Sequence, residues 1–82
     1  MSDSVIAAHR YCKNNRGRLK NDSVCGCFHC LGIFSPSDIK EWIKDPDGTA
    51  LCPLCGVDSV IGESSGYPIT KEFLEKMHRH WF

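Results

Sequence analysis

Two Cys-x-x-Cys pairs are the part of this chain best suited to chemistry. Cys27-Phe28-His29-Cys30 and Cys52-Pro53-Leu54-Cys55 are separated by 21 residues, slightly beyond the usual spacing between the halves of a four-cysteine zinc site. A two-residue gap lets the chain curl so that both sulfurs reach one ion, and Zn²⁺ prefers four such ligands in a tetrahedron. Gly56 eases the turn after the second pair and leaves amides free to donate to thiolates.

The pattern therefore predicts one structural Zn²⁺ held by Cys27, Cys30, Cys52 and Cys55. An iron site of the rubredoxin type would use the same four thiolates, so the sequence leaves the choice of metal open.

Two further cysteines lie outside these pairs. Cys25 precedes the first pair, and we expect it to support the site or to replace Cys27 as a ligand, although only Cys27 has the two-residue gap to Cys30. We expect Cys12 to be a small buried apolar residue. His9 and Cys12 lie about one helical turn apart, so a second metal site that includes Cys25 is an open alternative.

In a reducing compartment, paired cysteines bind metal more often than they form disulfides. The first four residues contain no basic residue, and the apolar run from Val5 to Ala8 is too short for a signal peptide. Every longer apolar cluster is interrupted by charged residues or proline, which excludes a membrane-spanning segment. The sequence thus predicts a cytoplasmic protein with no membrane partner.

The charges are distributed unevenly along a chain whose net charge is zero. Residues 1–22 form a basic segment of net charge +3, and the other sixty residues carry −3. This asymmetry can mark a surface that binds phosphates or another anionic ligand, although a solvated helix face explains it equally well. The candidate phosphate-binding residues are Arg10, Lys13, Arg16, Arg18 and Lys20.

The elements that must position the cysteines can be read from local patterns. Val5, Ala8, His9 and Cys12 have helical spacing and predict a first helix over residues 3–12, which the turn signal at 14–17 would end. Two further helices are expected. One begins after an N-cap at Ser35 and carries an apolar stripe of Ile39, Trp42 and Ile43 until the Asp-Pro-Asp-Gly turn at 45–48.

The last helix begins near Thr70 and buries Phe73, Leu74, Met77 and Trp81. Short strands are expected at 49–51 and 59–61, on either side of the second cysteine pair.

These elements predict a small α+β metal-bound domain, a zinc-ribbon or treble-clef-like double knuckle with short β-hairpins and two to three helices. A chain of 82 residues without repeats or linkers is expected to form one domain over 1–82. Its parts would be the basic segment 1–22, a zinc core over 23–62 and a C-terminal helix over 67–82. We expect His29 to point outward from the first knuckle, and His78 and His80 to lie on different faces of the last helix.

From Cys25 onward the chain resembles a family of small bacterial proteins described only as cytoplasmic proteins. The matching words are CGCFHCLGIFSPSDIKEWI, TALCPLCGVDSVIG, SGYPIT and the terminal Trp81-Phe82, with a weaker match at His9 and Asn15-Arg16. The resemblance implies a zinc protein of the bacterial cytosol and implies no particular reaction.

Three classes of function fit the sequence to different degrees. The favoured hypothesis is a zinc-dependent binding or adaptor module for a protein or small ligand, since no nucleophile is paired with a base. The alternative is a nucleic-acid-binding protein, in which the basic segment contacts phosphates and exposed Phe28 and His29 stack on bases.

An enzyme is the least favoured class. A metal-dependent nuclease would need an open second site, for which His9, Asn15 and Asp58 are the scattered candidates, and a thiol reaction would use Cys25.

Overall fold

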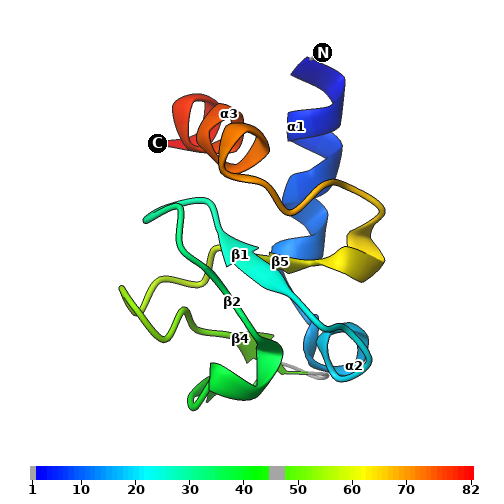
Figure 1. Cartoon of the computed structure of the whole chain (residues 1–82), viewed down its shortest axis with the longest axis vertical. Coiled ribbons are helices and arrows are strands. Elements are labelled where there is room, and N and C mark those ends of the chain that lie inside the picture. Colours follow the sequence, from blue (N-terminus) through cyan, green and yellow to red (C-terminus); the bar gives the residue numbers. More distant parts are fainter. Residues whose placement is uncertain (1, 45–47) are drawn as a thin grey trace.

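The first and last helices lie side by side at one end of the molecule, and the strands lie beyond them (Figure 1). The computed structural model describes residues 2–44 and 48–82. Helix α1 spans Ser2–His9 and continues into a 3₁₀ turn, η1, over Arg10–Cys12, whereas helix α3 spans Lys71–Trp81. The predicted first helix is thus present, with its last turn tightened.

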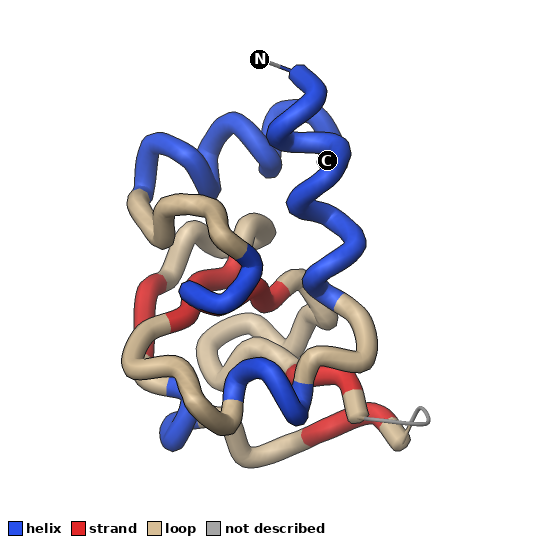
Figure 2. Tube along the Cα trace, turned by 90° about the vertical axis from the view of Figure 1, so that its right-hand side faces the viewer, coloured by secondary structure: helices blue, strands red, loops and turns tan. Residues whose placement is uncertain are grey.

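The strands are short and form two antiparallel sheets, which lie together in the lower half of the molecule in Figure 2. The strands are β1 (Cys25–Cys27), β2 (Ile33–Phe34), β3 (Trp42–Ile43), β4 (Thr49–Ala50) and β5 (Val60–Gly62). One sheet has the order β2-β1-β5, and the other is the hairpin of β3 and β4. Strand β1 therefore lies at the centre of the larger sheet and ends at Cys27.

Strands β1 and β5 are buried on both faces of the sheet, and successive side chains of each strand point to opposite faces. Ile61 belongs to a core shared with the terminal helices, and its neighbour Val60 belongs to a core shared with the cysteines. The helix-side core consists of Val5, Ala8, Cys12, Phe28, Ile61, Leu74 and Met77. The cysteine-side core consists of Leu19, Cys25, Cys27, Ile39, Ala50, Cys52 and Val60.

Helix α3 begins where the sequence predicts. The Thr70 hydroxyl oxygen accepts a hydrogen bond from the amide of Phe73 at 3.2 Å, which satisfies one of the free donors of the first turn. Leu74 and Met77 are fully buried, whereas Trp81 at the end of the helix remains 37% exposed. The apolar stripe therefore anchors the first two turns of α3 most strongly.

The prediction of a helix after Ser35 is wrong beyond the first turn. Ser35 is the N-cap, as expected, and it forms a capping box with Asp38, but the two residues cap only a 3₁₀ turn, η2, over Pro36–Asp38. The chain then becomes extended at Ile39 and enters β3. Pairing of Trp42 with Ala50 in the hairpin outweighs the helical spacing, which rested on only three apolar residues.

Residues 14–19 form a turn followed by a short helix that the sequence did not predict. Asn14 has a φ of +49°, as a turn at this position requires, and α2 then spans Arg16–Leu19. Leu19 is 1% exposed, so burial in the cysteine-side core holds this single turn of helix in place.

The predicted turn at 45–48 lies largely outside the described residues, but Gly48 has a φ of +90°, which suits glycine. The predicted strands at 49–51 and 59–61 correspond to β4 and β5, each shifted by at most one residue.

The predicted fold class, a small α+β domain with short antiparallel sheets, is confirmed. No helix in the described part of the chain is long and apolar enough to cross a membrane.

Candidate metal centre

Four cysteine sulfurs form one cluster. The Sγ atoms of Cys27, Cys30, Cys52 and Cys55 all lie within 4.8 Å of one another. Two of the sulfur pairs, Cys27 with Cys55 and Cys30 with Cys52, are 3.7 Å apart. A tetrahedral ion with metal–sulfur bonds of about 2.3 Å would place its ligands about 3.8 Å from one another. The donor set therefore fits a single tetrahedral metal ion.

The first knuckle, residues 27–32, begins at the end of β1. The carbonyl of Cys27 accepts a hydrogen bond from the amide of Leu31 at 2.8 Å, and the amide of Cys27 donates to the carbonyl of Gly32 at 2.9 Å. The amide of His29 also points at the Cys27 sulfur, 3.3 Å away. These bonds close the loop so that Cys30 returns beside Cys27.

The second knuckle, residues 52–57, repeats this pattern of hydrogen bonds. The carbonyl of Cys52 accepts from the amide of Gly56 at 2.9 Å, and the amide of Cys52 donates to Val57 at 3.0 Å. The amide of Leu54 lies 3.4 Å from the Cys52 sulfur. The two cysteine pairs thus sit in equivalent backbone loops that face one another across the cluster.

Each knuckle turns through a residue with positive φ directly after its second cysteine. Gly56 has a φ of +80°, as the sequence indicates, but the corresponding residue of the first knuckle is Leu31, with a φ of +65°. Leucine adopts this conformation at a cost, because its Cβ approaches the following carbonyl. The side chain of Leu31 packs against the helix-side core, and this burial offsets the cost.

The electrostatics of the thiols favour a bound cation. Burial raises the pKa of Cys27 above its ordinary value, although amide donors from Cys30 and His29 oppose the rise. Burial also opposes ionisation of Cys52, but the amides of Leu54 and Cys55 and the neighbouring thiols outweigh it and lower the pKa of Cys52. Four thiolates this close together repel one another, so full ionisation requires a compensating positive charge.

Cys25 lies outside the cluster, in β1 two residues before Cys27. It is fully buried in the cysteine-side core, and its thiol lies 3.5 Å from the carbonyl oxygen of Phe34 on the neighbouring strand. Burial raises the pKa of Cys25 to about 12, so the thiol is protonated near neutral pH.

The second metal site considered for His9, Cys12 and Cys25 is not formed. Cys12 lies in the helix-side core and Cys25 in the cysteine-side core. Within residues 2–44 and 48–82, the four-cysteine cluster is the only group of three or more side chains placed to hold a metal.

His29 is not part of the cysteine cluster, as expected, but its ring is only half-exposed because it packs against residues near the C-terminus. Its ring lies edge-on to Phe82, 4.8 Å between centroids, and 6.0 Å from the ring of His78, and its Nδ1 atom is buried without a hydrogen-bond partner. The neighbouring Phe28 is only 1% exposed, since it belongs to the helix-side core. Phe28 therefore provides no surface on which a base could stack.

The other histidines also gather near the C-terminus. The ring of His9 packs 4.0 Å from Trp81, the Nδ1 atom of His78 lies 3.1 Å from the Phe28 carbonyl oxygen, and His80 meets Trp81 edge-on. Burial lowers the pKa of His9, as does the nearby Lys13, and Asp58 partly opposes them. His78 and His80 make different contacts, as expected for residues two apart on a helix.

Asn15, a candidate for a nuclease site, has a structural role. Its amide nitrogen donates to the carbonyls of Tyr11 and Val60, and its oxygen accepts from the amide of Ala50. The side chain is thereby engaged at both ends and is only 1% exposed. Both polar atoms of the Asn15 side chain are therefore engaged within the fold, which argues against its use in a nuclease site.

The basic residues of the first 22 positions make different contacts. The guanidinium of Arg16 lies over the ring of Trp42, 5.1 Å from its centroid, whereas that of Arg18 lies over Tyr11 at 5.0 Å. Arg16 and Lys20 line one groove of about 590 Å³, and Arg18 is not among its lining residues. Arg10 and Lys13 are exposed on the preceding turn.

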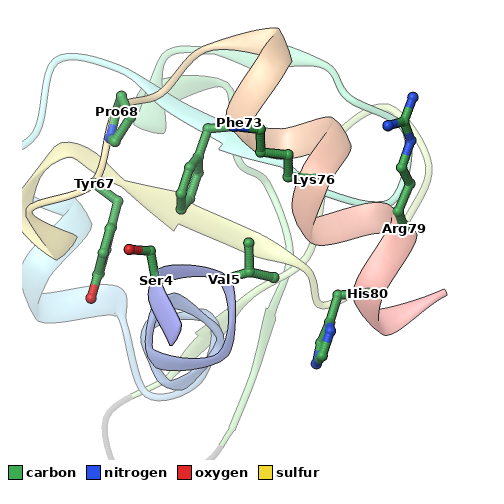
Figure 3. A pocket seen from close by; sticks show the side chains of 8 residues that line it. All are labelled: Ser4, Val5, Tyr67, Pro68, Phe73, Lys76, Arg79 and His80. Carbon is green, nitrogen blue, oxygen red and sulfur yellow. The ribbon is translucent and has the colours of Figure 1, made fainter. Parts of the chain in front are cut away.

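A further groove, which the sequence did not indicate, lies between α1 and α3. Ser4 and Val5 border it on one side, Tyr67 and Pro68 on another, and residues of α3 on the third (Figure 3). The one local signal was the spacing of Phe73, Lys76 and His80, which share a face of α3. That the face meets Val5 and Tyr67 depends on tertiary packing.

The chain matches no family model, and no curated protein or solved structure is significantly similar to it. The resemblance to small bacterial cytoplasmic proteins therefore stays a prediction. The fold and the cysteine cluster define the chain as a small α+β domain with a double-knuckle, metal-binding centre.

Proposed function

We propose that this protein is a small cytoplasmic binding module whose fold is stabilised by one structural Zn²⁺. The observation that carries the proposal is the convergence of four sulfurs within 4.8 Å, on two loops with the same hydrogen-bond pattern. A site made only of thiolates favours zinc or iron over calcium or magnesium, and iron would bind the same four cysteines. The resemblance to small bacterial cytoplasmic proteins supports zinc and the compartment.

A structural role for the metal follows from its ligands. Catalytic zinc keeps a coordination position open for water or substrate, whereas Cys27, Cys30, Cys52 and Cys55 would fill all four positions. The amides of His29 and Leu54 donate to two of the sulfurs and hold them in place. The ion would then act by joining the two knuckles, and binding would take place on the surface that they support.

The experiment is metal analysis followed by removal of the metal. We expect one zinc per chain after purification from cells grown without added metal, and loss of far-ultraviolet circular dichroism when a strong chelator is added. The physical reason is that a domain of this size has little other source of cooperative stability. Restored signal after addition of Zn²⁺ serves as the control. A fully folded protein without metal would contradict the proposal.

Nucleic-acid binding is a second candidate, and one observation favours it. Arg16 and Lys20 lie one helical turn apart in the groove of about 590 Å³ that Trp42 also lines. The burial of Phe28 removes the stacking surface that the sequence had indicated. If Arg16 and Lys20 contact phosphates, affinity for single-stranded RNA should fall steeply with salt, with a smaller slope in Arg16→Gln. The absence of binding at low salt would exclude this function.

A further inference from the structure

The groove between α1 and α3 has a volume of about 610 Å³, within the range of sites that bind small molecules. It is bordered by α1, by the segment before α3 and by α3 itself, and these three segments surround the open space in Figure 3. Val5, at the base, is buried in the helix-side core, so this side of the groove is rigid.

Two aromatic rings form one wall of the groove. The rings of Tyr67 and Phe73 are nearly parallel, with an interplanar angle of 10° and centroids 5.6 Å apart. Both side chains are half-buried and pack against the helix-side core, which fixes their positions. With Val5 and Pro68 they offer an apolar surface of fixed shape to the body of a small ligand.

The α3 border of the groove, next to Phe73, also carries basic side chains. Lys76, Arg79 and His80 line the groove from α3, and none of the lining residues is acidic. Arg79 is already paired with Glu75 at 3.0 Å, whereas no ion pair to Lys76 occurs among the described side chains. Among the described side chains, Lys76 is therefore a permanent cation with no acidic partner in the lining of an apolar groove, which matches a ligand with one negative charge.

We propose that this groove binds a small carboxylic acid with an aromatic or branched apolar body, its carboxylate facing Lys76 and His80. The apolar body would lie against Tyr67 and Phe73. This inference rests on the proposed function, since it names the class of ligand that the metal-stabilised module takes. Selectivity would come from charge complementarity at the α3 border, and the aromatic wall would contribute most of the contact area.

The test uses the zinc-loaded full chain and hydrocinnamate as probe, with the uncharged hydrocinnamamide as its matched control. Amide NMR should show saturable shifts centred on residues 67–80, with a dissociation constant in the high-micromolar to low-millimolar range for a ligand of this size. We expect the amide to bind about tenfold more weakly, because it lacks the charge that faces Lys76.

Two matched variants locate the charge. Lys76→Gln should weaken hydrocinnamate binding by about threefold to tenfold and leave hydrocinnamamide binding unchanged, because only the carboxylate uses the ammonium group. Lys71→Gln changes an exposed lysine of the same helix that does not line the groove, and it should bind both probes as the unaltered protein does. All three proteins should give the same dispersed spectrum, since both lysines are exposed.

Several results would overturn the proposal. They are absence of saturable binding up to millimolar probe, equal affinity for acid and amide, or shifts centred elsewhere. Shifts at residues 67–80 that grow with protein concentration alone would show that a second copy of the chain fills the groove, which also overturns it. Because the spectrum reports the fold independently, failure here would leave the metal-dependent module standing. Unfolding without zinc would in turn be observed whether or not the probe binds.

Discussion

Burial and metal binding rank Cys25 and Cys30 in opposite orders of importance. Cys25 is fully buried, whereas Cys30 and Cys55 are exposed. In a protein held together by packing alone, the buried thiol would matter most to stability. If the clustered thiols hold a metal, the exposed Cys30 matters more, because removing one of four ligands disrupts the whole centre.

This reversal gives a direct prediction. Cys30→Ala should abolish stoichiometric zinc and leave the chain largely unfolded, whereas Cys25→Ala should retain one zinc and lose about 1–2 kcal/mol from the small cavity. Zinc content by mass spectrometry and urea unfolding of the zinc-loaded proteins provide the measurements. A Cys25→Ala protein that loses its metal while Cys30→Ala keeps it would show that the ligand assignment is wrong.

At the residue scale, the cluster was predictable because its geometry is local. Two cysteines separated by two residues must lie near one another in any tight turn, so the spacing favours Cys27 over Cys25 as the partner of Cys30. The positive φ of Leu31 was not predictable, because nothing in a leucine marks that conformation. The contact of His29 with Phe82 joins residues far apart in the sequence, and no local pattern indicates it.

At the scale of elements, the central strand lies so close to α3 that a glycine is required. A Cβ atom on Gly26 would lie 2.7 Å from a methyl carbon of Leu74 and 3.2 Å from one of Ile69. Leu74 is fully buried, so its methyl group would have to shift within a packed core. Gly26 therefore lets the last helix pack directly on the strand that ends at Cys27.

Gly26→Ala should accordingly destabilise the zinc-loaded protein by about 1–3 kcal/mol, because the added methyl group overpacks the contact between β1 and α3. The matched control is Gly17→Ala, in α2, where a Cβ atom would meet nothing within 4 Å. That variant should be more stable by about 0.5–1 kcal/mol, since alanine favours a helix over the unfolded chain. Thermal unfolding measures both, and shifts in the same direction would contradict this account of Gly26.

Elements with their own start signals could be predicted, and elements made by pairing could not. Thr70 and Ser35 cap the turns that follow them, because capping involves only neighbouring residues. Trp42 lies in a strand because it pairs with Ala50 across a turn, so the helical spacing of Trp42 and its apolar neighbours was misleading. The groove beside α3 depends on three segments and is likewise absent from local patterns.

At the scale of the whole molecule, Asn15 connects the N-terminal segment to both sheets. Its amide nitrogen donates to Val60 of β5 at 2.8 Å, and its oxygen accepts from Ala50 of β4 at 3.0 Å. Strand β4 leads into the second knuckle, and β5 pairs with β1, which leads into the first knuckle. The Asn15 side chain therefore links the strands that support the two knuckles. Three hydrogen bonds thus offset the cost of burying this polar side chain.

Asn15→Ala should cost the zinc-loaded protein about 2–4 kcal/mol, because it leaves the buried amide of Ala50 and the carbonyl of Val60 without their partner. Urea unfolding gives the free energy, and amide hydrogen exchange at Ala50 should accelerate with it. The matched control is Asn21→Ala, an exposed asparagine for which a change within about 0.5 kcal/mol is expected. Zinc should remain bound in both variants, because neither change touches the thiols. An Asn15→Ala protein as stable as the control would show that the two sheets are held together by the cysteine cluster alone.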